Sequence, residues 1–119
     1  MTHQFAERFA EEWIEAWNSH DLDRILSHYT EDFSIETPMA LKLFPYTKGI
    51  IKGKVEIREY WKVGIERIPD LKFELLDLLT GINNLAIYYV NIATNKRSVE
   101  MMSFNSDHKV NKVVVTYTE

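Results

Sequence analysis

The stretch from Trp13 to Thr37, WIEAWNSHDLDRILSHYTEDFSIET, constrains the fold more than any other part of the chain. It continues a helical pattern in which Phe5, Phe9, Trp13 and Trp17 recur every four residues and form one apolar helix face. The polar residues at 18–20 break this pattern. We therefore predict a first helix over residues 2–17 that ends in a sharp turn.

A second helix and a first strand are predicted directly after this turn. Asp21 can cap the helix, whose inner face consists of Leu22, Ile25, Leu26 and Tyr29. Two helices joined so tightly must fold back on each other. The segment 32–37, DFSIET, then alternates between polar and apolar residues as a strand does, and Pro38 ends it.

The following segment, 38–52, shows no clear period and contains Pro45 and two glycines. A loop of about 15 residues in a small domain usually has a function. Two interpretations remain open: a flap over the mouth of a pocket, or a short edge strand around Ile50 and Ile51.

The C-terminal half changes from a helical pattern to a period of two. A third helix is predicted from Lys54, and Pro69 closes it. The predicted strands of an antiparallel meander, separated by turn residues, are Leu71–Thr80, Leu85–Ala93, Arg97–Asn105 and Val110–Thr118. The pattern leaves open which face of the first two strands points inward.

These elements predict a single domain over residues 1–119 of the α+β class. Three N-terminal helices would pack on a curved antiparallel sheet and form a cone, whose open end is the natural cleft.

Composition limits the classes of partner. The 119 residues contain 14 basic and 18 acidic side chains without a basic stripe, which argues against nucleic acid as a partner. Without cysteine there is no disulfide framework, and a cytoplasmic location is expected. The sequence contains no apolar run of about 20 residues, so no membrane span is predicted. The spacing of the histidines does not predict a metal site. The sequence also lacks a phosphate-loop pattern, so no nucleotide cofactor is predicted.

The order of these elements, together with several short motifs, resembles the nuclear transport factor 2-like superfamily, and in particular its SnoaL-like branch. The motifs that carry the resemblance along essentially the whole chain are W…WN.HDLD…HY.ED, I.GK..IR.YW, PDL.FELLD and FN…KV..VV.TY. The resemblance implies the cone-shaped fold. It leaves the activity open, because the superfamily includes isomerases, cyclases, dehydratases, hydrolases and binding modules.

The resemblance to the ketosteroid isomerase branch implies positions for three catalytic groups. The catalytic tyrosine of that branch falls on Trp13, its carboxylate base falls on Thr37, and its oxyanion-hole acid falls on Glu100. Glu36, next to Thr37, points to the other side of an alternating strand. Two of the three groups are therefore missing, which argues against ketosteroid isomerisation. The polyketide cyclases of the SnoaL type imply an aspartate base, for which Glu100 and Asp77 are the candidates.

Glu100 is the stronger candidate for a catalytic group. It is in phase with Met102 and Phe104, so its carboxylate faces the interior if they do, and burial would then raise its pKa. In the opposite phase, Val99 and Met101 face inward and Glu100 lies in water. Asp77 is better explained as a structural residue.

The remaining candidate residues form the wall of a pocket for a flat apolar ligand. The alternative is that these residues only pack the hydrophobic core, which large aromatic side chains fill efficiently. The predicted wall consists of Trp13, Trp17, Tyr29, Thr37, Tyr60, Trp61, Met102, Phe104, Val113, Val115 and Tyr117.

Two functional hypotheses follow. In the first, the protein is an isomerase-like or cyclase-like enzyme that moves a proton on a small hydrophobic or aromatic molecule. In the second, it is a non-catalytic ligand-binding or interaction module. In either case, if Glu100 points inward, then Val99, Met101 and Val114 give the sheet an apolar outer face, which predicts a homodimer formed through the sheet.

Overall fold

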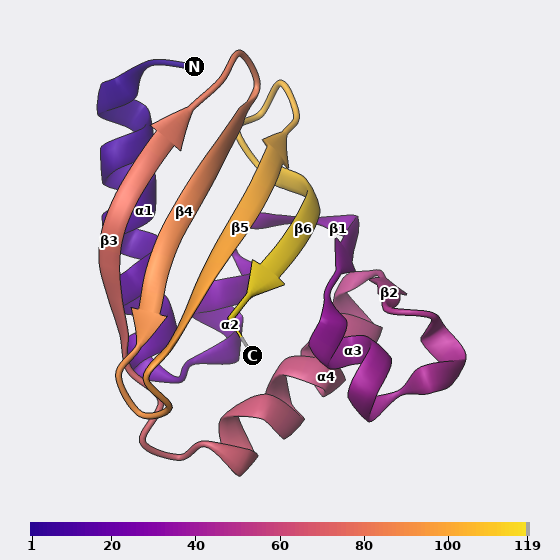
Figure 1. Cartoon of the computed structure of the whole chain (residues 1–119). Helices are drawn as coiled ribbons and strands as arrows, with labels where there is room; N and C mark the ends of the chain where they lie inside the picture. The colour runs from indigo at the N-terminus through magenta and orange to yellow at the C-terminus, as the bar shows by residue number, and fades with distance from the viewer. Residues whose placement is uncertain (119) are drawn as a thin grey trace.

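A six-stranded curved sheet and the helices on one of its faces make up the fold (Figure 1). The structure is a computed structural model and describes residues 1–118. The elements in chain order are α1 (His3–Ser19), α2 (Leu22–Leu26), β1 (Tyr29–Glu36), α3 (Pro38–Leu43), the 3-10 helix η1 (Pro45–Thr47), β2 (Ile50–Lys52), α4 (Lys54–Arg67), β3 (Phe73–Thr80), β4 (Asn84–Asn91), β5 (Lys96–Phe104) and β6 (Val110–Tyr117).

Capping groups define the two N-terminal helices. The Thr2 hydroxyl accepts a hydrogen bond from the Phe5 N–H at 3.1 Å and starts α1. His20 ends it in the left-handed conformation with φ 61°, and its N–H donates to the Trp17 carbonyl. The Asp21 carboxylate caps the first turn of α2. The predicted sharp turn between two helices is therefore present.

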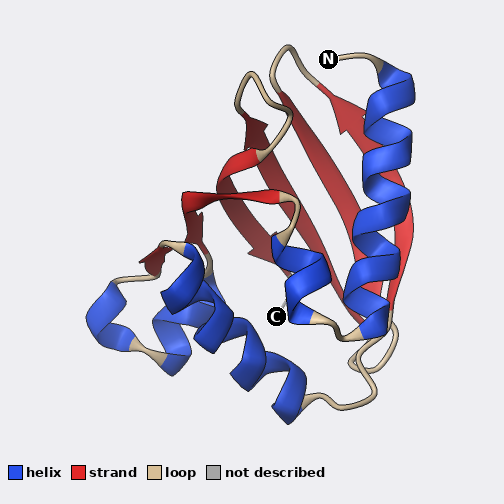
Figure 2. Cartoon of the chain, turned by 180° about the vertical axis from the view of Figure 1, so that it is seen from behind, coloured by secondary structure: helices blue, strands red, loops and turns tan. Residues whose placement is uncertain are grey.

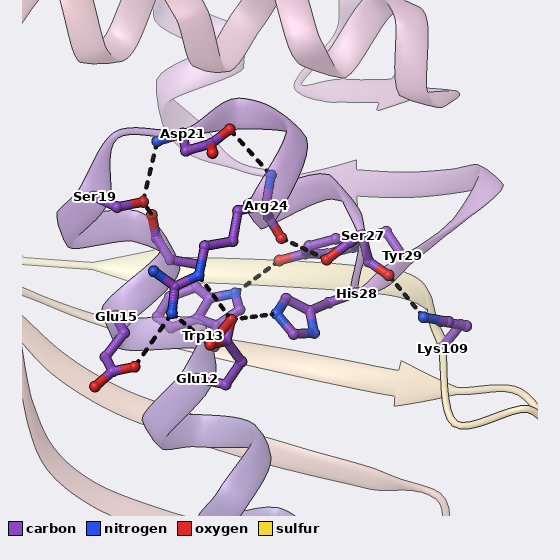
Figure 3. Close-up of polar contacts among 11 residues, drawn as sticks. Glu12, Trp13, Glu15, Ser19, Asp21, Arg24, Ser27, His28, Tyr29 and Lys109 are labelled. Carbon is purple, nitrogen blue, oxygen red and sulfur yellow. Dashed lines mark hydrogen bonds and ion pairs between the residues drawn. The ribbon is translucent and has the colours of Figure 1, made fainter.

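The second helix is shorter than predicted, and Tyr29 belongs to β1 instead. The helical pattern ends at Leu26, and the His28 carbonyl already accepts a hydrogen bond from the Val110 N–H at 2.9 Å. Pairing with β6 thus overrides the helical spacing of Tyr29. The Tyr29 side chain turns inward, where its hydroxyl accepts a hydrogen bond from Trp13 Nε1 at 2.8 Å (Figure 3).

The segment 38–52 is folded, and the edge-strand interpretation is confirmed by β2. Before that strand comes α3, a helix that the sequence analysis missed. Thr37 caps α3 by accepting a hydrogen bond from the Met39 N–H at 3.3 Å. The missed signal was the pair Thr37-Pro38, a capping residue followed by a proline in the first helical turn.

The sheet order is β2-β1-β6-β5-β4-β3, and the C-terminal four strands form the predicted antiparallel meander. One strand pair departs from the prediction, because β1 runs parallel to β6. Inward residues on β4 are Leu85, Ile87 and Tyr89, which settles the phase of that strand. On β3, a bulge between Leu75 and Asp77 changes the phase along the strand.

The helices lie on the concave side of the sheet, and the opposite side of the sheet carries none of them (Figures 1 and 2). The buried core follows this arrangement. Phe5 and Phe9 of α1 pack on Phe104 of β5, with ring centroids 5.8 Å and 4.9 Å apart. Side chains therefore fill the end of the cone where α1 begins. Within residues 1–118, none of the helices has the length and apolar character needed to cross a membrane.

Candidate functional site

A cavity of about 400 Å³ opens at the other end of the cone, between the concave face of the sheet and α1, α3 and α4. Its volume falls within the range of small-molecule sites. Helices and connecting loops contribute Trp17, Thr37, Met39, Leu43, Tyr60, Trp61, Gly64, Arg67, Ile68, Leu71 and Thr94 to its lining. Strands contribute Ile35, Phe73, Tyr89, Asn91, Lys96, Ser98, Glu100, Val115 and Tyr117.

Hydrogen bonds between α1 and β3 position the aromatic wall of this cavity. The Asn18 side chain donates to the Phe73 carbonyl at 3.0 Å and accepts from the Phe73 N–H at 2.7 Å. His20 Nε2 lies 2.8 Å from the Leu71 carbonyl oxygen. These contacts hold Trp17 and Phe73 side by side, with ring centroids 5.4 Å apart. Trp61 of α4 meets Trp17 edge-on at 5.0 Å and extends the wall.

Glu100 is the acidic residue in the wall, and its side chain is held in place by one tyrosine. The Tyr89 hydroxyl donates a hydrogen bond of 2.6 Å to Glu100 Oε2. Glu100 faces inward with Met102, whereas Met101 is exposed, so the structure has the phase that the sequence analysis favoured. Burial raises the pKa of the Glu100 carboxyl to about 7, against the opposing effect of the Tyr89 hydrogen bond.

The tyrosines around Glu100 stay protonated at neutral pH. Burial raises the pKa of Tyr89 well above its usual value, and the nearby Glu100 carboxylate raises it further. Burial also raises the pKa of Tyr60 to about 12. Their hydroxyl groups are therefore hydrogen-bond donors, while Glu100 can change its protonation state near neutral pH.

Two further polar groups of the wall have no partner in the described part of the chain. The Trp17 indole N–H and the Tyr117 hydroxyl are buried, and neither forms a hydrogen bond within residues 1–118. A buried polar group without a partner costs about 1–3 kcal/mol. A ligand that offers an oxygen atom to these groups would recover that free energy.

The predicted wall residues divide into two groups. Glu100 and six of the predicted wall residues line the cavity; the six are Trp17, Thr37, Tyr60, Trp61, Val115 and Tyr117. The residues that lie in the core instead are Trp13, Tyr29, Met102, Phe104 and Val113. The physical reason is their position along the cone: Phe104 packs on α1 at the filled end, and the Trp13 indole is covered by Phe73, Tyr89 and Tyr29.

Asp77 does not belong to the site. It is exposed beside the bulge in β3, and its carboxylate accepts a hydrogen bond from the Leu78 N–H at 2.8 Å. The sequence analysis missed Tyr89, the partner of Glu100. Its alternation with Leu85 and Ile87 carried the signal, but the apolar residues between them made the inward phase ambiguous.

The fold and the cavity define an α+β cone with one open end. The SnoaL-like domain family matches residues 10–118, and the chain belongs to this family. A SnoaL-like protein of unknown function from Burkholderia thailandensis is 37% identical, with a TM-score of 0.94 over 100% of this chain and 99% of that one.

More distant solved structures share the fold. A candidate isomerase of the SnoaL-like family from Agrobacterium tumefaciens is 15% identical, with a TM-score of 0.76, covering 96% of this chain and 97% of that one. A candidate ketosteroid isomerase from Kribbella flavida is 18% identical, with a TM-score of 0.69, covering 92% and 75%. No protein with a curated function matches this sequence significantly.

Proposed function

We propose that the protein is an enzyme that moves a proton on a small, largely apolar molecule, with Glu100 as the general acid and base. One observation carries the proposal: a carboxyl group whose pKa is raised to about 7 lies in the wall of an aromatic cavity. A general acid–base group works best when its pKa is near the working pH, because both protonation states are then populated. The SnoaL-like family includes isomerases and cyclases, which agrees with this chemistry.

The polar side chains of the cavity have separate roles in the proposed proton transfer. The ionised Glu100 carboxylate removes a proton from a carbon atom next to a carbonyl group and returns it to a second position. Tyr89 keeps one carboxylate oxygen fixed, which leaves the other oxygen for the substrate. The unpaired Trp17 N–H and Tyr117 hydroxyl are donors for the oxygen that becomes negative as the proton leaves.

Solvent deuterium exchange tests the proposal. A panel of cyclic and aryl ketones is incubated with the protein in deuterated buffer, and NMR follows exchange at the carbon next to the carbonyl. We expect Glu100→Gln to slow the catalysed exchange by about 10²- to 10⁴-fold. Tyr89→Phe should retain part of the rate and move its pH dependence upward, because loss of the hydrogen bond raises the pKa of Glu100 further.

The second candidate is a non-catalytic ligand-binding protein. It is favoured by Thr37, which lines the cavity at the position where the resemblance to ketosteroid isomerases implies a carboxylate base. Mass spectrometry of the native protein would then detect a co-purifying apolar molecule. Exchange rates that are equal for Glu100→Gln and the unaltered chain would exclude the catalytic role and leave this candidate.

We also propose that two copies pair through the outer face of the sheet. No helix within residues 1–118 covers this face, which carries exposed Leu79 and Met101 with partly exposed Tyr88, Val99 and Val114. An apolar face of this kind on a protein surface usually marks an interface.

The absence of cysteine suits a reducing compartment, and we propose that the protein is located in the cytoplasm.

A further inference from the structure

The charged side chains around the cavity differ in sign from the chain as a whole. The sequence has a formal net charge of −4. Apart from Glu100, the charged residues of the lining are Arg67 at the end of α4 and Lys96 at the start of β5, both cations. The mouth of the cavity is thus positive on a negative protein.

Exposure places these two cations at the mouth. Arg67 and Lys96 are exposed, whereas Glu100 and Tyr89 are buried. The end of α4 and the turn between β4 and β5 lie at the same end of the molecule in both views (Figures 1 and 2). Lining residues from two separate elements therefore direct positive charge at one opening.

Neither cation is neutralised inside the described chain. Arg24 and Arg58 each pair with a carboxylate, Arg24 with Glu12 at 2.5 Å and Arg58 with Asp23 at 2.5 Å. Arg67 and Lys96, in contrast, form no ion pair within 4.0 Å among residues 1–118. Their side chains are available to a ligand.

We propose that the molecule bound in this cavity is an amphipathic organic anion, with its apolar body against the aromatic wall and its anionic group at Arg67 and Lys96. The inference rests on the proposed small-molecule site and names its substrate class. Arg67 can bind a planar anionic group through two parallel N–H bonds, and Lys96 adds a point charge.

The same arrangement fixes the orientation of the ligand. The Glu100 carboxylate repels an anionic group, and the apolar interior offers it no compensating cation. The anionic group therefore stays at the mouth, and the carbon atoms of the apolar body lie next to Glu100. The proton that moves belongs to the end of the molecule that is farthest from the charge.

A pair of fluorescent dyes tests this inference without any measurement of activity. 1-Anilinonaphthalene-8-sulfonate carries one negative charge, and N-phenyl-1-naphthylamine is its uncharged parent. Binding of both is followed with the full chain and with the double variant Arg67→Gln/Lys96→Gln. Each exposed cation contributes roughly 2- to 5-fold, so we expect the double variant to bind the sulfonate about 10-fold more weakly. Its affinity for the uncharged dye should not change.

Three control variants and one change of ionic strength make the result specific. Lys62→Gln removes a cation from α4 that lies outside the lining and should leave sulfonate binding unchanged. Arg67→Lys/Lys96→Arg keeps both charges and should restore most of the affinity. Gly64→Leu adds a side chain inside the lining and should weaken both dyes, which places them in the cavity. Raising the ionic strength from about 0.01 to about 1 M should weaken only the sulfonate.

The inference is overturned if the double variant loses no more sulfonate affinity than Lys62→Gln, or if both dyes lose affinity equally. It is also overturned if neither dye binds or if Gly64→Leu leaves sulfonate binding intact. In each of these cases, the proposed proton transfer by Glu100 is still decided by its own exchange assay with uncharged ketones. Failure of the two proposals is therefore distinguishable.

Discussion

Glu100 combines two properties that are opposed in a stable protein, since it is ionisable and buried. The cost of ionising it in the folded state is the reason for its raised pKa. The Tyr89 hydrogen bond partly offsets this cost by stabilising the carboxylate.

The stability of the protein should record the ionisation of Glu100. Its pKa rises from 4.5 in the unfolded chain to about 7 in the folded protein, so the folded state binds more protons between these two values. The contribution of Glu100 to the free energy of unfolding is therefore full below pH 4.5 and falls as the pH rises to about 7. The total loss is roughly 3 kcal/mol.

Glu100→Gln removes this dependence. The free energy of unfolding is measured by urea denaturation from pH 4.5 to 8, and the difference between the unaltered chain and the variant should shift by roughly 3 kcal/mol in favour of the variant. Glu74→Gln on the exposed side of β3 is the matched control for removal of a carboxylate. A difference that is constant with pH would show that Glu100 ionises as freely when folded as when unfolded.

Among the elements, α4 has the largest influence on the shape of the cavity. It contributes five lining residues, which are Tyr60, Trp61, Gly64 and Arg67 within the helix and Ile68 at its end. Gly64 is unusual among them because glycine weakens the interior of a helix. A Cβ atom added there would meet no atom within 4 Å beyond its chain neighbours and the backbone of its own helix. Because Gly64 lines the cavity, we expect a side chain at this position to occupy part of it.

Substitution of Gly64 should separate the stability of α4 from the capacity of the cavity. We expect Gly64→Ala to stabilise the protein by about 0.5–1 kcal/mol, because alanine favours the helix and meets no obstacle. Gly64→Leu should keep this gain in part but fill the cavity and weaken binding of the uncharged dye. Urea denaturation and dye fluorescence measure the two effects. Tight dye binding by Gly64→Leu would contradict this role of the glycine. Glu59→Ala, on the exposed face of α4, should change neither quantity by much.

In the molecule as a whole, the helices lie on one side of the sheet only. The concave face of the sheet is covered by helices, and the outer face carries exposed apolar side chains, with Leu79 58% exposed on the edge strand β3 and Met101 48% exposed on β5. A closed twofold pair would cover the same patch on both copies. The residues proposed to pair lie outside the lining of the cavity.

The proposed dimer should dissociate when charge is added to the centre of the outer face. We expect Met101→Glu to shift the mass measured by analytical ultracentrifugation from two chains to one at micromolar concentration. Val55→Glu is the matched control, because Val55 of α4 is 77% exposed and lies away from the sheet. A single-chain mass for the unaltered protein at the same concentrations would refute pairing through the sheet.

The sequence by itself determined the elements that depend on local pattern. The spacing from Phe5 to Trp17 predicted α1, and the period of two after Pro69 predicted the meander, because helix and strand periods are properties of neighbouring residues. For Glu100 the alternation with Met102 and Phe104 favoured the inward phase but left the opposite phase open, and the structure decided between them. Tyr29 shows the limit of this reasoning, since its helical spacing was overridden by pairing with β6.

Only the tertiary structure decided which part of the cone is filled and which is open. The apolar faces at Trp13 and Trp17 look alike in the sequence, yet Trp13 is packed in the core and Trp17 lines the cavity. The position of a cavity depends on the summed volumes of side chains from distant segments, which a local pattern does not contain. The contact between Tyr89 and Glu100, and the presence of both Arg67 and Lys96 in the lining of one cavity, arise for the same reason.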